Sequence, residues 1–453
     1  MLAMPQTPRS RRLSVAIAIA AGIIGVLLRL YYVTHAQVFQ PLDLPNARAD
    51  AVDYYRYAWN LAHHGVFASD LPGAATLHPD SFRDPGYPLF LAIGLHATAS
   101  YDYWYAGILI AQALLGGIAI ALAGLAFAGR MPNPWLAGAL LLAAVWPHSI
   151  AMCSYVLSEN VVAFLVVLGI LALRWAPRSK SAWRLIIPGI VFGAAGLTNS
   201  VLLPVAPCIA VFLVWRRCVP WRAAVLLLAA SLALPTLWWV RNATLESGAT
   251  SSQRAFINLV QGSWPTYHAA YQLAMKGDPV GKQTSDAIDA EIATFQQGMA
   301  PGLSNLATRM AHMPMRMAAW YASKPALLWG WDIRIGQGDI YVYPTRNSPF
   351  KNLPAWRVIE SLCVALNPLL MLLTLGGVVL VLARSPDIEQ VGTGITLLIV
   401  TLVYAVLQSE PRYSVPFRTL EMLLAASAAA AVVNWASERR RASQHNQRAD
   451  LPS

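Results

Sequence analysis

Two carboxylates and two phenols recur at helical spacing soon after the first apolar stretch of the chain. They are Asp50, Asp53, Tyr54 and Tyr57, at positions i, i+3, i+4 and i+7, and Leu61 extends the pattern. On a helix these side chains share one face. Such a face could bind a sugar, a cation or a basic partner, and a plain solvated helix is the alternative. Charged residues make up only 12% of the sequence, so acids beside an apolar stretch point to a functional site.

Arginines suited to phosphate recur at the ends of apolar stretches. Arg83 lies in HPDSFRDPGYP (78–88), where prolines and a glycine interrupt the chain before an apolar helix. Arg241 closes another apolar stretch, and Arg412 lies in SEPRY (409–413). A fixed guanidinium matches the geometry of phosphate. The alternatives are an interfacial anchor for Arg83 and a surface salt bridge from Arg412 to Glu410.

Three further ionisable residues lie in or beside apolar segments. Glu159 lies one turn inside an apolar stretch. It is either a functional group or half of a buried structural ion pair. Arg29 lies near the end of the first apolar stretch. It either joins Arg412 in one basic group or extends its side chain toward the lipid headgroups. Methionine and tryptophan positions in 310–329 predict a helix on the membrane surface, which places Lys324 near the headgroups.

Several kinds of chemistry have no motif in this sequence. It lacks H-E-x-x-H, G-x-S-x-G and C-x-x-C, and 276–284 has the wrong glycine spacing for a P-loop. The four cysteines show no ligand spacing (Cys153, Cys208, Cys218 and Cys363). His63-His64 is better explained as the solvent-exposed end of a helix than as a pair of metal ligands. We therefore expect no metal site and no cofactor, although a divalent metal is not excluded, and no nucleic-acid partner.

The composition identifies the elements that must position these groups. Hydrophobic residues make up 57% of the chain and the mean hydropathy is +0.47, outside the range of soluble globular domains. A spanning helix needs about 20 apolar residues, and about ten stretches are candidates. They are 14–34, 104–129, 134–152, 156–175, 184–198, 200–216, 222–240, 361–383, 390–408 and 414–434. The short pair 184–198 and 200–216 is either tilted or one broken pair around Thr198-Asn199. The sequence predicts an all-α polytopic membrane protein.

Basic residues occupy alternate loops between these stretches. They are Arg9, Arg11, Arg12, Arg130, Arg174, Arg178, Lys180, Arg184, Arg216, Arg217, Arg222, Arg384, Arg439, Arg440, Arg441 and Arg448. Trp175, Trp183, Trp215 and Trp221 lie at the same ends. This alternation predicts that both termini are cytoplasmic. Most acidic residues, and all of the candidates above, then face outward.

On this topology the chain divides into five parts. They are a cytoplasmic N-terminus (1–13), a transmembrane core (14–241) with the first outer loop (35–103), an outer helical region (242–360), C-terminal transmembrane helices (361–436) and a basic cytoplasmic tail (437–453). A cleaved signal peptide is the alternative for 9–36. The length of that apolar run and the charge alternation favour a span.

The outer-face motifs, in their order, resemble the GT-C membrane glycosyltransferases of the protein O-mannosyltransferase and lipid A aminoarabinose transferase type. The order begins with Asp50-x-x-x-Tyr54 and Arg83-x-Pro85-Gly86-Tyr87-Pro88. It continues with Ser158-Glu159, Gly196-Leu197-Thr198, Arg241-Asn242 and Glu410-x-Arg412-Tyr413. The resemblance runs over nearly the whole chain, and it implies a GT-C-like fold with about ten transmembrane helices and juxtamembrane helices outside.

The resemblance also implies an activity. Such enzymes move a sugar from a polyprenyl-phosphate carrier to an acceptor hydroxyl, usually with inversion. Asp50 takes the position of the catalytic base, and Asp53, Tyr54, Tyr57 and Glu159 are expected to bind the sugars. Arg241 and Arg412 are the first candidates to hold the lipid phosphate, followed by Arg83 and Lys324.

Two positions depart from the family pattern. Members often carry a second acid after the catalytic aspartate, where this chain has Ala51, which weakens the case for a metal. Many have arginine after the Leu-Thr motif, where this chain has Asn199, so one phosphate contact is left unfilled.

Other activities remain as alternatives. They are a polymerase or ligase using polyprenyl-diphosphate glycans and a flippase for lipid-linked sugars. The expected partners are a membrane, a lipid-linked sugar donor and a lipid, glycan or protein acceptor. The expected location is the bacterial inner membrane, with the site facing the periplasm.

Overall fold

The computed structural model describes residues 7–42, 44–45, 47, 49–98, 100–175, 182–245, 248–385 and 387–449. Arg178, Lys180 and the last four residues of the predicted tail lie outside them. The described chain is mostly helical, with one two-stranded antiparallel ribbon of β1 (Gln37–Val38) and β2 (Thr345–Arg346). The prediction of an all-α polytopic membrane protein is confirmed.

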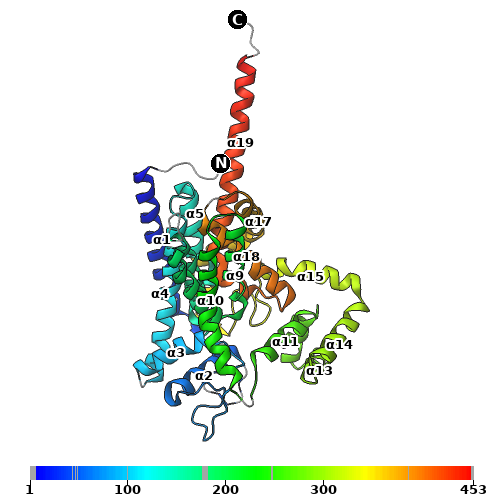
Figure 1. Cartoon of the computed structure of the whole chain (residues 1–453). Coiled ribbons are helices and arrows are strands. Elements are labelled where there is room, and N and C mark those ends of the chain that lie inside the picture. Colours follow the sequence, from blue (N-terminus) through cyan, green and yellow to red (C-terminus); the bar gives the residue numbers. More distant parts are fainter. Residues whose placement is uncertain are drawn as a thin grey trace.

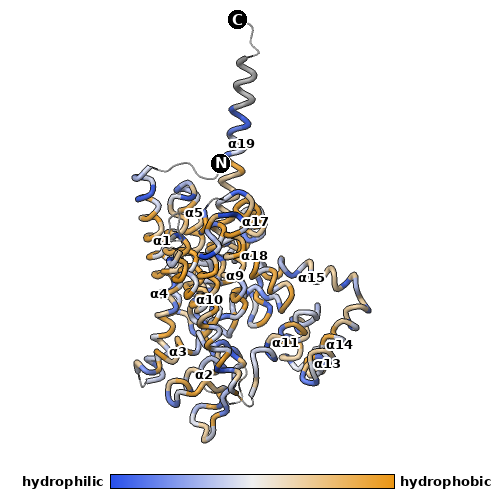
Figure 2. The backbone as a smooth tube through the Cα atoms, in the orientation of Figure 1, coloured by the Kyte–Doolittle hydropathy of each residue, from blue (hydrophilic) through white to orange (hydrophobic). Residues whose placement is uncertain are grey.

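Six helical segments are long and apolar enough to cross a membrane. They are α1 (Pro8–His35), α4 (Tyr101–Phe127), α10 (Trp221–Ala243), α17 (Pro354–Arg384), α18 (Ile388–Val406) and the segment Pro411–Arg441, which includes most of α19 (Arg418–Ala449). Apolar residues gather in this bundle (Figure 2). The first turns of α1 and the end of α19 lie on one face of the bundle (Figure 1), as two termini on the same side require.

The other four predicted spans coincide with shorter or bent helices. In 134–152, α5 (Asn133–Val145) and α6 (Pro147–Ala151) meet at a bend of 50°. In 156–175 lies α7 (Glu159–Ala172), and 184–198 and 200–216 hold α8 (Ile186–Thr198) and α9 (Val205–Trp215). Asn199 is extended between α8 and a short 3-10 turn. A break at Thr198-Asn199 therefore separates α8 from α9.

Small residues let the spans approach closely. A Cβ on Gly117 of α4 would lie 2.9 Å from the Gly22 carbonyl oxygen and 2.7 Å from the Val26 nitrogen, both on α1. Without an aqueous phase to drive helix association in the bilayer, close backbone packing of this kind contributes much of the stability.

The position of the Arg29 side chain is explained by the bend between α5 and α6 and not by the lipid headgroups. Its side chain is buried, and Nη1 donates to the carbonyl oxygens of Gly25 at 3.0 Å and Ala144 at 3.4 Å. The bend at Trp146-Pro147 frees carbonyls at the end of α5, and a buried carbonyl needs a donor. Both expectations for Arg29, a place in the outer basic group and a side chain reaching the headgroups, are therefore wrong.

The face opposite the termini, hereafter the outer face, carries the remaining helices. α2 (Asp50–His64) and α3 (Gly86–Ala97) lie at the end of the bundle (Figure 1). The region 242–360 forms α11 (Ser251–Gly262), α12 (Tyr267–Met275), α13 (Pro279–Gln296), α14 (Met299–Ala311), α15 (Pro314–Leu328) and α16 (Pro349–Asn352). In Figure 1, α15 runs across the direction of α1 and α4.

Local sequence explains where these outer helices begin. Thr250 and Gln253 form a capping box at the start of α11, and Asp278 caps α13 immediately before Pro279. Asp278 lies in the stretch 276–284, whose glycine spacing is wrong for a P-loop, and α13 begins within that stretch. His63 and His64 form the exposed last turn of α2.

Candidate active site

Asp50 lies between two arginines that come from distant parts of the chain. It is the first residue of α2, where the free N–H groups and the helix dipole favour a carboxylate. Oδ1 accepts from Arg83 Nη2 at 2.8 Å, and Oδ2 accepts from Arg412 Nη2 at 2.5 Å. The Asp50 side chain is 29% exposed. Each carboxylate oxygen therefore has one guanidinium, and solvent still reaches the group.

Arg412 joins Asp50 to Glu159. It lies in the 3-10 segment Pro411–Phe417 before α19, and its Nε lies 3.0 Å from Glu159 Oε1. Glu159 is the first residue of α7, and both side chains are mostly buried. One planar guanidinium thus contacts two carboxylates through two of its nitrogens, Nη2 and Nε, which lysine cannot reproduce.

Arg83 contacts the side chains on the face of α2 that the helical spacing predicted. Its Nη2 lies 2.7 Å from Asp53 Oδ2, and its guanidinium carbon lies 5.4 Å from the centre of the Tyr54 ring. Tyr54 packs edge-to-face on Tyr87 of α3. Asp50, Asp53 and Tyr54 therefore share a face, and Arg83 is its common partner.

The two arginines determine the charge state of the carboxylate. Burial by itself would raise the pKa of Asp50, but Arg83 and Arg412 outweigh it and hold that pKa well below its ordinary value. Burial raises the pKa of the Tyr54 phenol. At neutral pH the site therefore presents an ionised Asp50 and a neutral phenol.

A second ion pair that the sequence did not predict lies behind this cluster. Asp84 Oδ1 accepts from Arg254 Nη2 at 2.7 Å, and Asp84 Oδ2 accepts from the Ser200 main-chain N–H at 3.1 Å. Arg254 also donates to Ser200 Oγ at 3.2 Å. Arg254 of α11 thus reaches the residue after Asn199, beside the position where the family pattern has arginine. Asp84 belongs to the Arg83 motif, but nothing around Arg254 in the sequence marks it.

Tyr57 points to a different cluster from its helical neighbours. Its hydroxyl donates to Asp80 Oδ1, and Arg241 Nη1 donates to the Asp80 carbonyl oxygen at 2.6 Å. Arg241 Nη2 donates to the Phe67 carbonyl oxygen at 3.3 Å, and its guanidinium lies over the Trp238 ring at 4.8 Å. These contacts fasten the loop between α2 and α3 to the end of α10. None of these contacts of Arg241 and Tyr57 involves Asp50.

Lys324 is buried among main-chain carbonyls. Its ammonium donates to Gly262 at 2.9 Å, to Val406 at 3.4 Å and to Leu407. Gly262 ends α11, and Val406 ends α18, so a cation there meets the negative ends of two helix dipoles. Lys324 therefore ties the outer helices to the segment that leads to Arg412, and its role in phosphate binding stays a prediction.

Glu410 and Arg412 do not form the surface salt bridge considered above. Glu410 is buried, its Oε1 accepts from the N–H groups of Arg334 at 2.6 Å and Ile335 at 3.2 Å, and its Oε2 lies 3.1 Å from His268 Nε2. Glu410 thus anchors the outer helical region, which leaves Arg412 to Asp50 and Glu159.

The two departures from the family pattern each have a partner in the structure. Ala51 is fully buried, and its N–H donates to the Tyr343 hydroxyl at 3.4 Å. Asn199 Nδ2 donates to the Tyr404 hydroxyl at 3.4 Å. Among the described residues, no three His, Cys, Asp or Glu side chains are grouped so as to hold a metal ion.

Comparison with solved structures identifies the fold. The oligosaccharyltransferase of Archaeoglobus fulgidus, solved with a tethered acceptor peptide, matches with a TM-score of 0.51 and 14% identity over 93% of this chain and 50% of that chain. This chain thus spans half the length of that protein. ArnT of Cupriavidus metallidurans bound to undecaprenyl phosphate matches with a TM-score of 0.34 and 14% identity over 87% of this chain and 77% of that one. The fold assignment rests on the first match.

No protein-family model matches the chain, and no curated protein matches it significantly. The similarity is therefore one of structure. The resemblance to GT-C membrane glycosyltransferases that the ordered outer-face motifs predicted is confirmed for the fold: the chain is a polytopic membrane protein with a GT-C fold.

Proposed function

We propose that the protein is an inverting glycosyltransferase that moves a sugar from a polyprenyl-phosphate carrier to an acceptor hydroxyl on the outer face of the bacterial inner membrane. A fold alone does not specify a reaction, so the proposal depends on the site. The observation that carries it is the Asp50 carboxylate held between Arg83 and Arg412. A base and two phosphate-binding groups are thereby brought together from three segments of the chain.

Each part of the reaction has a group suited to it. Asp50 takes the proton of the acceptor hydroxyl while the acceptor oxygen bonds to the anomeric carbon of the sugar. The bond from that carbon to the phosphate oxygen breaks on the opposite side, so the configuration inverts. Polyprenyl phosphate leaves, and Arg83 and Arg412 stabilise the charge that develops on it. Asp53 and Glu159 hold these arginines, and Tyr54 lines the same face.

The ion pairs also suggest how the base is activated. A carboxylate whose pKa is held low by two guanidiniums is ionised but accepts a proton poorly. A donor phosphate would compete for the same guanidiniums and weaken their hold on Asp50. The pKa of Asp50 would then rise, so that the carboxylate becomes a stronger base only when the donor is bound.

The remaining candidates have roles that follow from their contacts. Arg254 is an additional candidate for the donor phosphate, because it reaches Ser200 beside the break after α8. Arg241 and Lys324 are predicted phosphate ligands whose observed partners are main-chain carbonyls. They can meet a phosphate only if these carbonyl contacts are exchanged, and we rank them after Arg83, Arg412 and Arg254.

The test is transfer of a labelled sugar by purified protein. Asp50→Asn keeps the size of the side chain and removes the base, so turnover should fall about 10²–10⁴-fold. Asp102→Asn, an exposed acid in the first turn of α4, is the matched control. Full turnover in Asp50→Asn would disprove the proposed base. A strict requirement for a polyprenyl-diphosphate donor would favour a polymerase or ligase, and carrier movement across vesicles without a glycosidic product would favour a flippase.

A further inference from the structure

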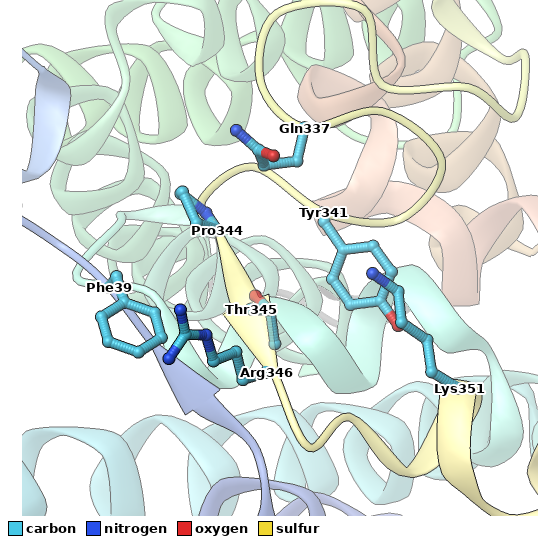
Figure 3. A pocket seen from close by; sticks show the side chains of 7 residues that line it. All are labelled: Phe39, Gln337, Tyr341, Pro344, Thr345, Arg346 and Lys351. Atoms are coloured by element: carbon cyan, nitrogen blue, oxygen red, sulfur yellow. The ribbon is translucent and has the colours of Figure 1, made fainter.

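A basic cavity lies on the outer face beside the β1–β2 ribbon. It has a volume of about 290 Å³ and includes Phe39, Tyr341, Arg346 and Lys351 in its lining. In Figure 3, Arg346 lies next to Phe39, and Lys351 lies next to Tyr341. The two cations therefore flank the cavity from two sides. The proposed transfer reaction uses neither of them.

Both cations are available to an anion. Arg346 lies over the Phe39 ring at 5.1 Å and Lys351 lies over the Tyr341 ring at 4.3 Å, and both side chains are exposed. None of the ion pairs of the described residues involves Arg346 or Lys351, and Glu360 of α17 interacts with Lys351 only electrostatically. A cation on an aromatic ring is held in place without losing its charge. The pair is thus positioned but not neutralised.

An apolar cavity shares Phe39 with the basic one. Its volume is about 370 Å³, and its lining includes Val33, Val38 and Leu109. These residues come from the outer ends of α1 and α4 and from β1, so the cavity lies at the ends of two helices that are long and apolar enough to cross a membrane. A charged compartment next to an apolar one matches a molecule with an anionic head and a hydrocarbon tail.

We propose that the two cavities bind one anionic membrane lipid, with its head-group phosphate between Arg346 and Lys351 and its first hydrocarbon segment beside Val33 and Leu109. This inference goes beyond the transfer reaction and does not rest on it. The site is separate from Arg83 and Arg412, although the ribbon connects the two regions. Tyr343, two residues before the ribbon's Thr345, accepts from the N–H of Ala51 next to Asp50.

Binding to the full chain in detergent tests the proposal without any sugar donor. Native mass spectrometry with phosphatidylglycerol, phosphatidylcholine or inorganic phosphate separates a lipid site from a phosphate site. We expect phosphatidylglycerol to bind in preference to both other probes. Arg346→Ala/Lys351→Ala should weaken phosphatidylglycerol binding about tenfold or more, because both cations are lost.

A matched control removes two positive charges elsewhere on the outer helices. Lys276→Ala/Arg316→Ala alters exposed residues of the α12–α13 turn and of α15, and it should leave binding unchanged. Equal loss in both double variants would show general electrostatic attraction and overturn the proposal. Inorganic phosphate that displaces the lipid at equal concentration would overturn the lipid assignment. If the double variant melts early, Arg346→Gln alone replaces it, and unchanged affinity in that folded variant counts against the site.

Discussion

Arg412 and Asp50 are separated by 362 residues of sequence, yet Arg412 Nη2 lies 2.5 Å from Asp50 Oδ2. The same guanidinium meets Glu159, so three segments of the chain converge on one planar group. Formation of this contact requires that α2, α7 and the segment before α19 are all in place. The proposed base is therefore positioned by the whole bundle.

Replacing Arg412 by lysine tests the need for a planar group. One ammonium cannot reproduce the Nε and Nη2 contacts of the guanidinium together, so Glu159 or Asp50 loses its partner. We expect Arg412→Lys to lower turnover about 10²–10³-fold, as for loss of one donor to a developing oxyanion. The measurement is the initial rate of sugar transfer. Arg357→Lys, at an exposed position of α17, is the control, and a similar fall there would mean that the loss is not specific to the site.

The pH dependence follows from the depressed pKa of Asp50. Because Asp50 in the folded protein stays ionised to below its ordinary pKa, the free enzyme should show no acid-side fall in kcat/KM from Asp50 above about pH 4. Arg83→Gln removes one of the two opposing charges and raises the pKa. The acid-side fall in kcat/KM should then move to higher pH in that variant.

The same shift gives the sign of a stability effect. A carboxyl group whose pKa is lower in the folded state stabilises the fold above its unfolded pKa, and that contribution disappears as the pH falls through the folded pKa. Arg83→Gln should therefore be less stable than the wild type at neutral pH, and its stability should fall less on acidification below about pH 4, because the pKa of Asp50 lies closer to its unfolded value. Identical pH profiles for both proteins would contradict the ion pair as its cause.

The sequence could predict where the six long apolar spans lie, though not their ends, and it could predict the outer-face motifs, because hydropathy and local spacing determine them. Asp50, Asp53 and Tyr54 share a face because a helix of any context places them so. The partners of Arg241 and Lys324 could not be predicted, since their acceptors are main-chain carbonyls such as Asp80 and Gly262. Carbonyls carry no sequence pattern.

The contacts of Arg29 and Arg254 also could not be predicted from the sequence, for two different reasons. Arg29 pairs with a carbonyl freed by a bend in another helix, and the bend itself depends on packing. Arg254 belongs to a polar helix whose docking places it beside Ser200 and Asp84. Only an arrangement of helices could reveal either contact.

Lys324 should make stability depend on pH in a specific window. Burial lowers the pKa of Lys324 to about 7. Between that value and the ordinary lysine pKa of about 10.4, the unfolded chain binds the proton more readily, so stability rises as the pH rises. Thermal inactivation in detergent should therefore be slower at pH 9 than at pH 7. Lys324→Met should abolish this slope, whereas an unchanged slope would assign it to other groups.

The loop of Arg83 depends on a close contact between two helices. Gly86 begins α3, and a Cβ there would lie 2.9 Å from Thr198 Cα at the end of α8. Backbone cannot yield as a flexible side chain does, so Gly86→Ala must move α3 away from α8 and shift Arg83, three residues earlier, relative to Asp50. We expect a loss of about 1–3 kcal/mol in stability, together with reduced sugar transfer.

Gly107 provides the matched comparison for this substitution. It is also a helical glycine, but a Cβ there meets nothing within 4 Å. Gly107→Ala should therefore leave transfer intact and, because alanine favours helix, slightly raise the melting temperature. The two variants are compared by melting in detergent and by initial transfer rate. Equal behaviour of the two would mean that the approach of α3 to α8 does not position Arg83, and the convergence on Asp50 would then need another support.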